Sequence, residues 1–144
     1  MEQESRTLQI FRAGSNQFAV FADDVLTIVE WRQPAALPHA PASVLGVVSI
    51  HGRMLTVLDL SQLLNQPQHS GNPANILALR GDEQLALAID DPGEMIELVT
   101  AALDTDGKLI TEVMNNKGDK IKILNVKELF PTAIQGCERR RRRF

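Results

Sequence analysis

Serine, histidine and aspartate, the three side-chain types of a hydrolytic triad, occur together in one short stretch of this sequence. Ser49, His51 and Asp59 lie within VVSIHGRMLTVLDL, residues 47–60. A nucleophilic serine needs a base within hydrogen-bonding reach, and one large class of hydrolases carries it on a G-x-S-x-G turn. That turn is absent, and Asp59 is the expected cap of a short helix. The stretch therefore predicts no catalytic site, and we expect the chain not to be an enzyme.

Two other groups of residues have the side chains, but not the spacing, of a chemical site. His39, His51 and His69 are scattered, whereas a metal centre needs three or four convergent ligands. The aspartate pairs at 23–24 and 90–91 are adjacent residues, and neighbours on a strand point to opposite faces. No glycine-rich phosphate-binding motif occurs. The sequence predicts neither a metal nor a cofactor, and the aspartates are expected at strand ends and turns.

Charge is distributed unevenly along the chain. The formal net charge of the 144 residues is -3. Arg139 to Arg143 hold five of the 15 basic residues, so residues 1–138 carry 10 basic against 18 acidic side chains, a net charge of -8. Binding to nucleic acid normally needs a basic face, so we expect no nucleic-acid partner for the folded part. The basic 136–144 tail is predicted to be solvated and flexible, or else to touch anionic lipid or RNA.

Cysteine content and hydropathy bear on the cellular compartment. The single cysteine, Cys137, has no partner for an intramolecular disulfide, which favours a reducing environment. The first residues lack the basic start and apolar core of a signal peptide, and no apolar run approaches the roughly 18 residues that span a bilayer. We therefore expect a cytoplasmic protein without membrane insertion.

The sequence contains two similar segments in the same order. QFAVFADDVLTIVEW (17–31) resembles QLALAIDDPGEMIEL (84–98) at an offset of 67. HGRMLTVLDLSQLL (51–64) resembles KGDKIKILNVKELF (117–130) at an offset of 66. The preserved spacing indicates a duplicated fold rather than a long repeat array. The prediction is a single domain over residues 1–135, built from two units at about 17–65 and 84–131.

Most of each unit is predicted to be β-strand. Apolar and polar residues alternate from Thr7 to Phe11, and short runs rich in Val, Ile and Leu are separated by Gly, Pro, Asn or Asp. Short helices are predicted after Asp59 and Asn125, because a Gln or Glu follows each of them at the capping-box spacing. The pattern indicates a mainly β fold, as small barrels or a sandwich, with few helices.

The segments after the two aspartate pairs are apolar and admit two interpretations. Val25, Ile28 and Trp31 follow the first pair, and Met95 and Ile96 follow the second. These residues either belong to the core, or some of them line a groove between the two units that accepts a partner helix. Sequence periodicity is compatible with both interpretations.

Several residues resemble, in order and spacing, the CheW-like family of chemotaxis coupling proteins. LPHAPASVLGVVSIHGRMLTVLDL (37–60) is similar to the family pattern L-P-x-x-P-x-x-[VI]-x-G-V-x-N-L-R-G-x-[VI]-x-P-V-x-D-L. The resemblance implies two interleaved five-stranded β-barrels with short helices and a hydrophobic groove between them. It also implies a non-enzymatic adaptor, which joins the cytoplasmic signalling tip of a chemoreceptor to the regulatory domain of a CheA-type histidine kinase. The matching positions are Leu37-Pro38, Pro41, Val44, Gly46-Val47, Gly52 and Asp59-Leu60.

The resemblance further assigns roles to individual residues. The family's receptor-facing V-x-x-V-x-E segment falls on Val25, Ile28 and Glu30, and the receptor-binding groove would also include Met95 and Ile96. The family's N-L-R-G turn, which is associated with coupling to kinase and receptor, is predicted between two buried strands, with Gly52 at its bend. The residues of this coupling turn are Ser49, Ile50, His51, Gly52 and Arg53.

The sequence departs from the family pattern at several positions. Ser49 and His51 replace the family's Asn and Arg, and Thr56 replaces a proline. Pro92 replaces a valine of a later strand and has no amide to donate. The segment between Leu98 and Lys117 is short and polar, where the family usually carries a further strand. A second hypothesis, from another class of protein, is a duplicated β-barrel that binds a small ligand in the groove between the units.

Overall fold

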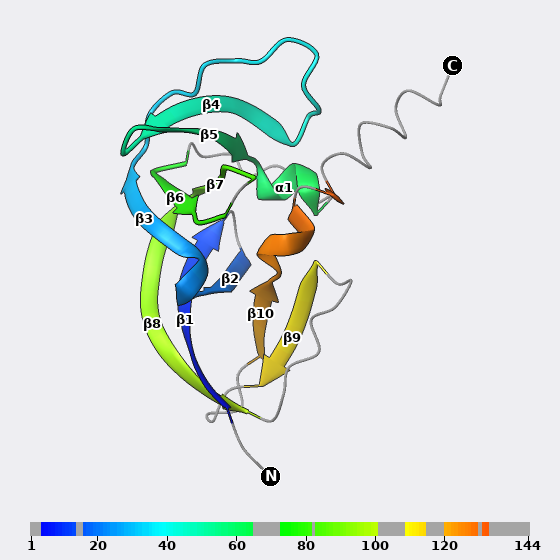
Figure 1. Cartoon of the computed structure of the whole chain (residues 1–144). Helices are drawn as coiled ribbons and strands as arrows, with labels where there is room; N and C mark the ends of the chain where they lie inside the picture. Colours follow the sequence, from blue (N-terminus) through cyan, green and yellow to red (C-terminus); the bar gives the residue numbers. More distant parts are fainter. Residues whose placement is uncertain are drawn as a thin grey trace, which may run out of the picture.

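The apolar and alternating segments of the sequence form ten strands in the described part of the chain. The computed structural model describes residues 4–13, 16–64, 73–81, 83–100, 109–114, 120–129 and 131–132. Figure 1 shows the strands in chain order from blue to orange. They are β1 (Glu4–Ala13), β2 (Asn16–Phe21), β3 (Val25–Glu30), β4 (Val44–Ile50), β5 (Arg53–Leu58), β6 (Asn75–Leu79), β7 (Leu85–Ile89), β8 (Asp91–Thr100), β9 (Ile110–Met114) and β10 (Lys120–Leu124).

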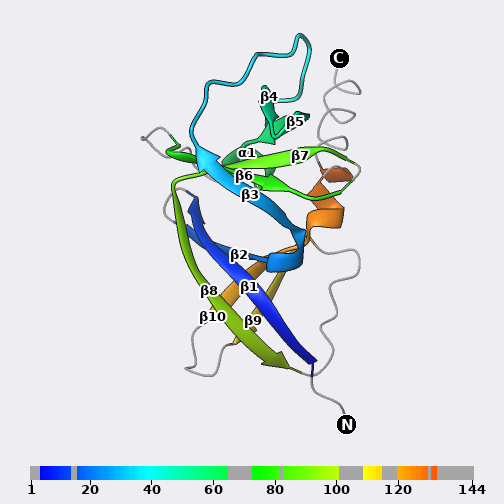
Figure 2. The same ribbon diagram turned by 60° about the vertical axis from the view of Figure 1, so that its left-hand side comes forward.

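The strands form two sheets of five, which confirms the predicted mainly β fold. The first two and last three strands make one sheet in the order β8-β1-β2-β10-β9, here called the terminal sheet. The others make the middle sheet in the order β3-β6-β7-β5-β4. Figure 2 shows the middle sheet packed above the terminal sheet. Within the described residues the edge strands of each sheet do not pair with each other, so the predicted barrels are seen as two open, curved sheets.

The two sheets have the same strand order when the halves of the chain are compared. Replacing β3, β6, β7, β5 and β4 by the strands five places away in sequence gives β8, β1, β2, β10 and β9, the order of the terminal sheet. The parallel pairings, β5 with β7 and β10 with β2, are equivalent in the same way. Each sheet takes two strands from one half of the chain and three from the other. This is the arrangement that a duplicated chain with exchanged strands would produce.

The aspartate pairs lie where the chain passes from one sheet to the other. The pair at 23–24 belongs to the 3-10 helix η1 (Ala22–Asp24) and not to a strand. Of the pair at 90–91, Asp90 connects β7 to β8, and Asp91 is the first residue of β8. The N–H of Arg80 donates to the carbonyl of Asp24, and the N–H of Asp90 donates to the carbonyl of Arg12, each over 2.8 Å. Both pairs therefore stand at strand ends and turns, as expected.

Buried side chains are arranged in three layers. The central cluster lies between the sheets and joins Phe11 and Phe18 of the terminal sheet to Leu77 and Leu87 of the middle sheet. Side chains alternate along a strand, so the opposite face of each sheet carries its own cluster. Burial of each large apolar side chain stabilises the fold by roughly 1.5–3 kcal/mol, so the central cluster holds the two sheets together. The outer clusters include Leu8, Ile10, Ile121 and Ile123 on the terminal sheet and Ile50, Leu55, Val57 and Ile76 on the middle sheet.

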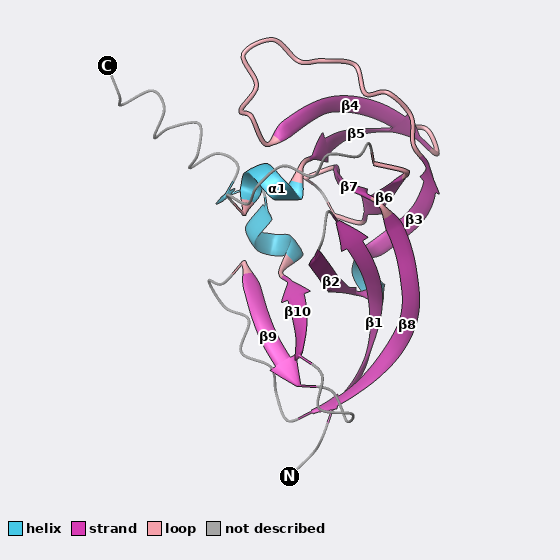
Figure 3. Cartoon of the chain, turned by 180° about the vertical axis from the view of Figure 1, so that it is seen from behind, coloured by secondary structure: helices cyan, strands magenta, loops and turns pink. Residues whose placement is uncertain are grey.

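Two short helices pack against the central cluster. α1 (Leu60–Leu63) begins after Asp59, whose carboxylate accepts a 3.0 Å hydrogen bond from an N–H in the first turn. η2 (Val126–Glu128) begins after Asn125, whose side-chain oxygen accepts a 3.2 Å hydrogen bond in the same way. Both predicted caps are confirmed, although the second helix is a 3-10 turn. Figure 3 shows the helices next to each other, and their contacts with the central cluster come from Leu60, Leu63 and Val126.

One strand lies where the sequence indicated none. β9 occupies part of the stretch between Leu98 and Lys117, and it pairs antiparallel with β10. Ile110 packs against the central cluster and Val113 against the terminal-sheet cluster, so the strand needs few apolar residues. The expectation that this strand is missing is therefore wrong, because an edge strand exposed to solvent can be largely polar and then resembles a loop in sequence.

Some predicted features lie outside the described residues. These are His69, Cys137, the segment 117–119 that repeats the glycine turn, and the basic tail at 136–144. Across the described ranges, the helices are all too short or too polar to cross a membrane.

Candidate protein-binding site

The hairpin of β4 and β5 turns at His51 and Gly52. Ile50 pairs with Arg53, so the connection has two residues. The φ angle is +50° at His51 and +76° at Gly52, as a type I′ turn requires at both central positions. A Cβ at Gly52 would meet nothing within 4 Å, so the position is open. The predicted turn is confirmed, and His51 is exposed at its tip.

The residues that flank the turn have different environments. Ser49 is exposed, whereas Ile50 is fully buried in the middle-sheet cluster. Arg53 is half-buried and donates from Nη2 to the carbonyl oxygen of Gly81 over 3.1 Å. Ile50 therefore anchors the hairpin to the core, and Arg53 ties it to the connection between β6 and β7. The residues of the predicted coupling turn that face solvent are Ser49, His51 and Gly52.

Two exposed residues beside the turn were missed by sequence reasoning. Arg32 donates from Nη1 to the carbonyl oxygen of Ser49 over 2.9 Å. Met54 pairs with Ser49 across the hairpin, and its side chain is 56% exposed. The apolar run MLTVL is typical of a buried strand. Strict alternation along β5, however, places Met54 on the other face of the sheet from the buried Leu55. With the exposed part of the turn they form what we call the hairpin patch: Arg32, Ser49, His51 and Met54.

The predicted receptor-facing segment forms β3, an edge strand of the middle sheet. Val25 and Ile28 are partly buried against the central cluster, whereas Glu30 is exposed. The pairing of β3 with β6 shifts register between Val25 and Thr27, and such a bulge explains how residues three apart face the same cluster. Of the three predicted residues, Glu30 is therefore the one most accessible to a partner.

The other predicted groove residues lie on β8, an edge strand of the terminal sheet. Met95 is 61% exposed, and Ile96 is partly buried against the terminal-sheet cluster. Adjacent strand residues point to opposite faces, so these two cannot line the same wall. Val25 and Ile28 pack on a different cluster from Ile96. The structure thus brings the turn residues together but divides the five predicted groove residues between two sheets.

Asp24, directly before β3, has a pKa raised above the ordinary aspartate value. Burial is the largest cause, because it disfavours the carboxylate, and the neighbouring charge of Asp23 adds to the rise. The positive charges of Arg6 and Lys127 favour the carboxylate and so lower the pKa of Asp24 in part. The guanidinium of Arg6 also lies 4.1 Å from the ring centroid of Phe21, which places a cation beside this crossing. Ionisation of Asp24 therefore works against the folded state.

The histidines do not form a metal centre in the part of the chain that the structure describes. No group of three or more His, Cys, Asp or Glu side chains could hold a metal ion there. His39 is exposed in a turn, with φ at +62°, and His51 is exposed on the hairpin. Ser49, His51 and Met54 on the hairpin, with Arg32 beside it, instead form an exposed surface of apolar and polar side chains, a composition common in protein interfaces.

The fold and sequence place the chain in a known class. A family model described as the CheW-like domain matches residues 7–133, which include all strands from β2 to β10. This chain therefore belongs to the CheW-like domain family. The crystal structure of the scaffolding protein TtCheW from Thermoanaerobacter tengcongensis aligns with a TM-score of 0.72, covering 88% of this chain and 93% of that chain. The sequence identity is 17%, so this likeness shows the fold alone.

Curated relatives resemble parts of the chain. The probable chemotaxis protein CheW of Rhizobium etli is 38% identical over 64 residues, which are 44% of this chain and 41% of that protein. The chemotaxis protein CheW of Rhizobium meliloti is 41% identical over 59 residues, or 41% of this chain and 38% of that protein. The chemotaxis protein CheW of Bacillus subtilis is 22% identical over 99 residues, which cover 67% and 63% of the two chains. The chain thus spans about two fifths of the rhizobial relatives it matches.

Proposed function

We propose that this protein is a non-enzymatic adaptor in chemotaxis, which couples chemoreceptors to a CheA-type histidine kinase. The observation that carries the proposal is the CheW-like domain match along residues 7–133. The names of the relatives, chemotaxis protein CheW, and of the structural neighbour, a scaffolding protein, support it. The protein would act in the cytoplasm and be recruited to receptor arrays at the membrane.

The hairpin patch is the proposed coupling surface. Its turn has fixed backbone geometry, because Ile50 is buried beneath it and Arg53 is bonded to Gly81. Met54 supplies an exposed apolar anchor of the kind that dominates small interfaces, and His51 and Arg32 supply donors around it. We expect an interface of standard or smaller size, in which Met54 and Arg32 account for most of the binding energy.

The proposed receptor contact involves the exposed members of the predicted groove. Glu30 and Met95 are accessible on the edge strands β3 and β8. Val25, Ile28 and Ile96 would support these strands from below, since each packs on a cluster. The buried central cluster occupies the interior between the sheets, where the alternative hypothesis would place a small ligand.

Binding to each partner separately tests the proposal. The full chain would be titrated against a receptor signalling-tip fragment and against a CheA-type regulatory domain by biolayer interferometry. Saturable binding to both is expected. Met54→Asp should weaken kinase binding at least tenfold, and Glu30→Lys should weaken receptor binding alone. The proposal is wrong if the wild-type chain binds neither partner.

A further inference from the structure

The pairing of the edge strand β8 with β1 shifts register at one place. Met95 pairs with Gln9. Three residues earlier on β8, Pro92 pairs with Phe11, which is only two residues from Gln9 on β1. One residue of β1 therefore stands opposite two residues of β8, as in a β-bulge. The residues of this bulge are Ile10 on β1 and Gly93 and Glu94 on β8.

The bulge decides which side chains of β8 face the core. Side chains alternate along a strand, so one extra residue exchanges the two faces of the strand beyond it. With the bulge in place, Leu98 is buried in the terminal-sheet cluster and Ile96 packs against it. Met95 lies on the other face of β8 and is 61% exposed. Without the extra residue, Met95 would point toward that cluster and Ile96 away from it.

The buried side chain of Gln9 holds the bulge from β1. Its Nε2 donates to the carbonyl oxygen of Ile10 over 2.8 Å and to the carbonyl oxygen of Gly93 over 2.9 Å. We call these two hydrogen bonds the Gln9 clamp. They satisfy one main-chain acceptor on each strand at the point where the ladder is interrupted. Gln9 is only 7% exposed, so its removal would leave two acceptors without a donor in a largely buried place.

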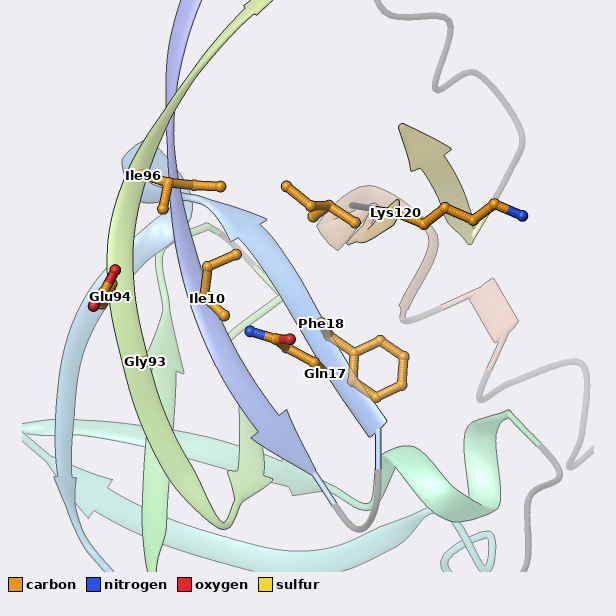
Figure 4. A pocket seen from close by; sticks show the side chains of 8 residues that line it. Ile10, Gln17, Phe18, Gly93, Glu94, Ile96 and Lys120 are labelled. Carbon is orange, nitrogen blue, oxygen red and sulfur yellow. The ribbon is translucent and has the colours of Figure 1, made fainter. Parts of the chain in front are cut away.

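Gly93 lets the two strands approach each other closely at the clamp. A Cβ at Gly93 would lie 3.0 Å from Cγ2 of Ile10 and 3.1 Å from its carbonyl oxygen, the same oxygen that accepts from Gln9. A hollow lies beside the bulge, and Ile10, Gly93 and Glu94 are among the residues that line it (Figure 4). Packing around the bulge is therefore incomplete on that side, which leaves the register of β8 dependent on the clamp.

The equivalent bulge in the middle sheet is held by apolar packing. At the offset of 67, Gly93 corresponds to Leu26, where the pairing of β3 with β6 also shifts register. The side chain of Leu26 packs against the middle-sheet cluster. Met95 corresponds to Ile28, and the residue that pairs with Ile28 is Leu77, which is buried in the central cluster. A leucine thus occupies, in the middle sheet, the place that a glutamine occupies in the terminal sheet.

We propose that Gln9 is a positioning residue for receptor binding, because the Gln9 clamp fixes the register of β8 and so keeps Met95 on the outer face. The inference rests on the proposed receptor contact at Met95, and it adds a residue too buried to touch the receptor itself. Loss of the clamp should weaken receptor binding. Kinase binding should be unaffected, since the hairpin patch belongs to the other sheet.

Gln9→Leu tests the clamp in the full chain. In the wild type, NMR should show cross-strand NOEs between position 9 and Met95 and between Leu8 and Ile96. In the variant these NOEs should weaken, and the amides of β8 should exchange at least about tenfold faster while those of β2 and β10 keep their rates. Receptor affinity should fall about tenfold with kinase affinity unchanged. Gln17→Leu is the matched control, because it makes the same change at an exposed position on β2.

Gly93→Ala provides a second route to the same bulge. Its Cβ would press on Ile10, so receptor affinity should again fall. Because both substitutions act on one bulge, Gln9→Leu and Gly93→Ala together should weaken receptor binding by clearly less than the product of the two single effects. Independent losses of stability at two unrelated sites would instead multiply.

The outcomes separate this inference from the adaptor function. NOEs and β8 exchange rates that stay unchanged in Gln9→Leu would overturn the clamp, whether or not a receptor binds. Wild-type receptor affinity in Gln9→Leu, or multiplicative effects in the double variant, would overturn the positioning role. If the wild-type chain binds no receptor, the adaptor function and the positioning role are both wrong, and the NMR comparison still decides whether Gln9 fixes the register.

Discussion

Arg32 donates from Nη1 to the main-chain carbonyl oxygen of Ser49 over 2.9 Å. This contact joins the segment after β3 to the β4–β5 hairpin, although the two residues are 17 positions apart. The same segment is held further along by Ala35, which forms a two-way backbone bridge with Val47. The chain that follows the proposed receptor strand is therefore fixed beside the proposed coupling turn.

Arg32→Ala should weaken kinase binding with little loss of stability. The contact is exposed, so its removal is expected to cost less than about 1 kcal/mol of unfolding free energy. Affinity for the CheA-type regulatory domain should fall about tenfold, because the variant loses a side chain of the patch and frees the Ser49 carbonyl. Arg12→Ala is the matched control, since it removes another exposed arginine contact, the 2.7 Å ion pair with Asp91. Equal effects of the two variants on affinity would contradict the role given to Arg32.

Two glycines should differ in their tolerance of alanine. A Cβ at Gly46 would lie 2.3 Å from the carbonyl oxygen of Ala35, and its φ is +147°. Gly52 has φ at +76° but open space around it. Gly52→Ala should therefore cost about 1 kcal/mol from backbone strain alone, and Gly46→Ala more than about 3 kcal/mol. Urea unfolding measures both, and a smaller loss for Gly46→Ala than for Gly52→Ala would refute this steric account.

Aspartate substitutions should separate core positions from binding positions. Ile28 is partly buried on the central cluster, so Ile28→Asp is expected to lower the unfolding free energy by roughly 2–4 kcal/mol. Met95 is 61% exposed, so Met95→Asp should change it by less than about 0.5 kcal/mol. In receptor-binding assays Met95→Asp should nevertheless reduce affinity. If Ile28→Asp keeps wild-type stability while losing the receptor, Ile28 belongs to the interface and its assignment to the core is wrong.

Asp24 should make the stability of the protein depend on pH. Its folded pKa is raised above the ordinary value of 3.8, so the folded state binds this proton more tightly than the unfolded state. The free energy of unfolding therefore falls as pH rises from below 3.8 through the folded pKa of Asp24. Asp24→Asn should remove that fall. The variant should therefore gain stability relative to the wild type at neutral pH more than it does at acid pH. Thermal unfolding across pH measures this difference, with the exposed Glu83→Gln as control; a variant with the wild-type slope would contradict it.

Residue patterns in the sequence predicted the individual strands and caps better than they predicted which strands pair in each sheet. The repeat around the aspartate pairs and the caps at Asp59 and Asn125 are local patterns, and both appear at the expected places. The strands β1 and β6 occupy equivalent places in the two sheets but lie outside the predicted units. Their sequences share the pattern of buried positions and few identical residues, so comparison of the two halves did not detect them. Their partners depend on long-range pairing, which the spacing of residues along the chain does not encode.

Exposure at the candidate site was also difficult to predict. Met54 and Ile50 stand in the same apolar stretch, yet one is 56% exposed and the other is fully buried. The difference depends on strand register, which the two-residue turn fixes at His51 and Gly52. Arg32 carries no local signal, since its partner is a main-chain carbonyl on another segment. Contacts between distant segments are decided by the packing of the sheets and not by sequence pattern.

The most direct test of the account is a bridging measurement with three components. An immobilised receptor signalling tip would be mixed with a CheA-type kinase regulatory domain, with and without this chain. The account predicts that kinase capture requires the chain, and that Met54→Asp abolishes capture while the variant still binds the receptor. Kinase capture that is the same with and without the chain, at concentrations that saturate each separate binding, would contradict the adaptor function.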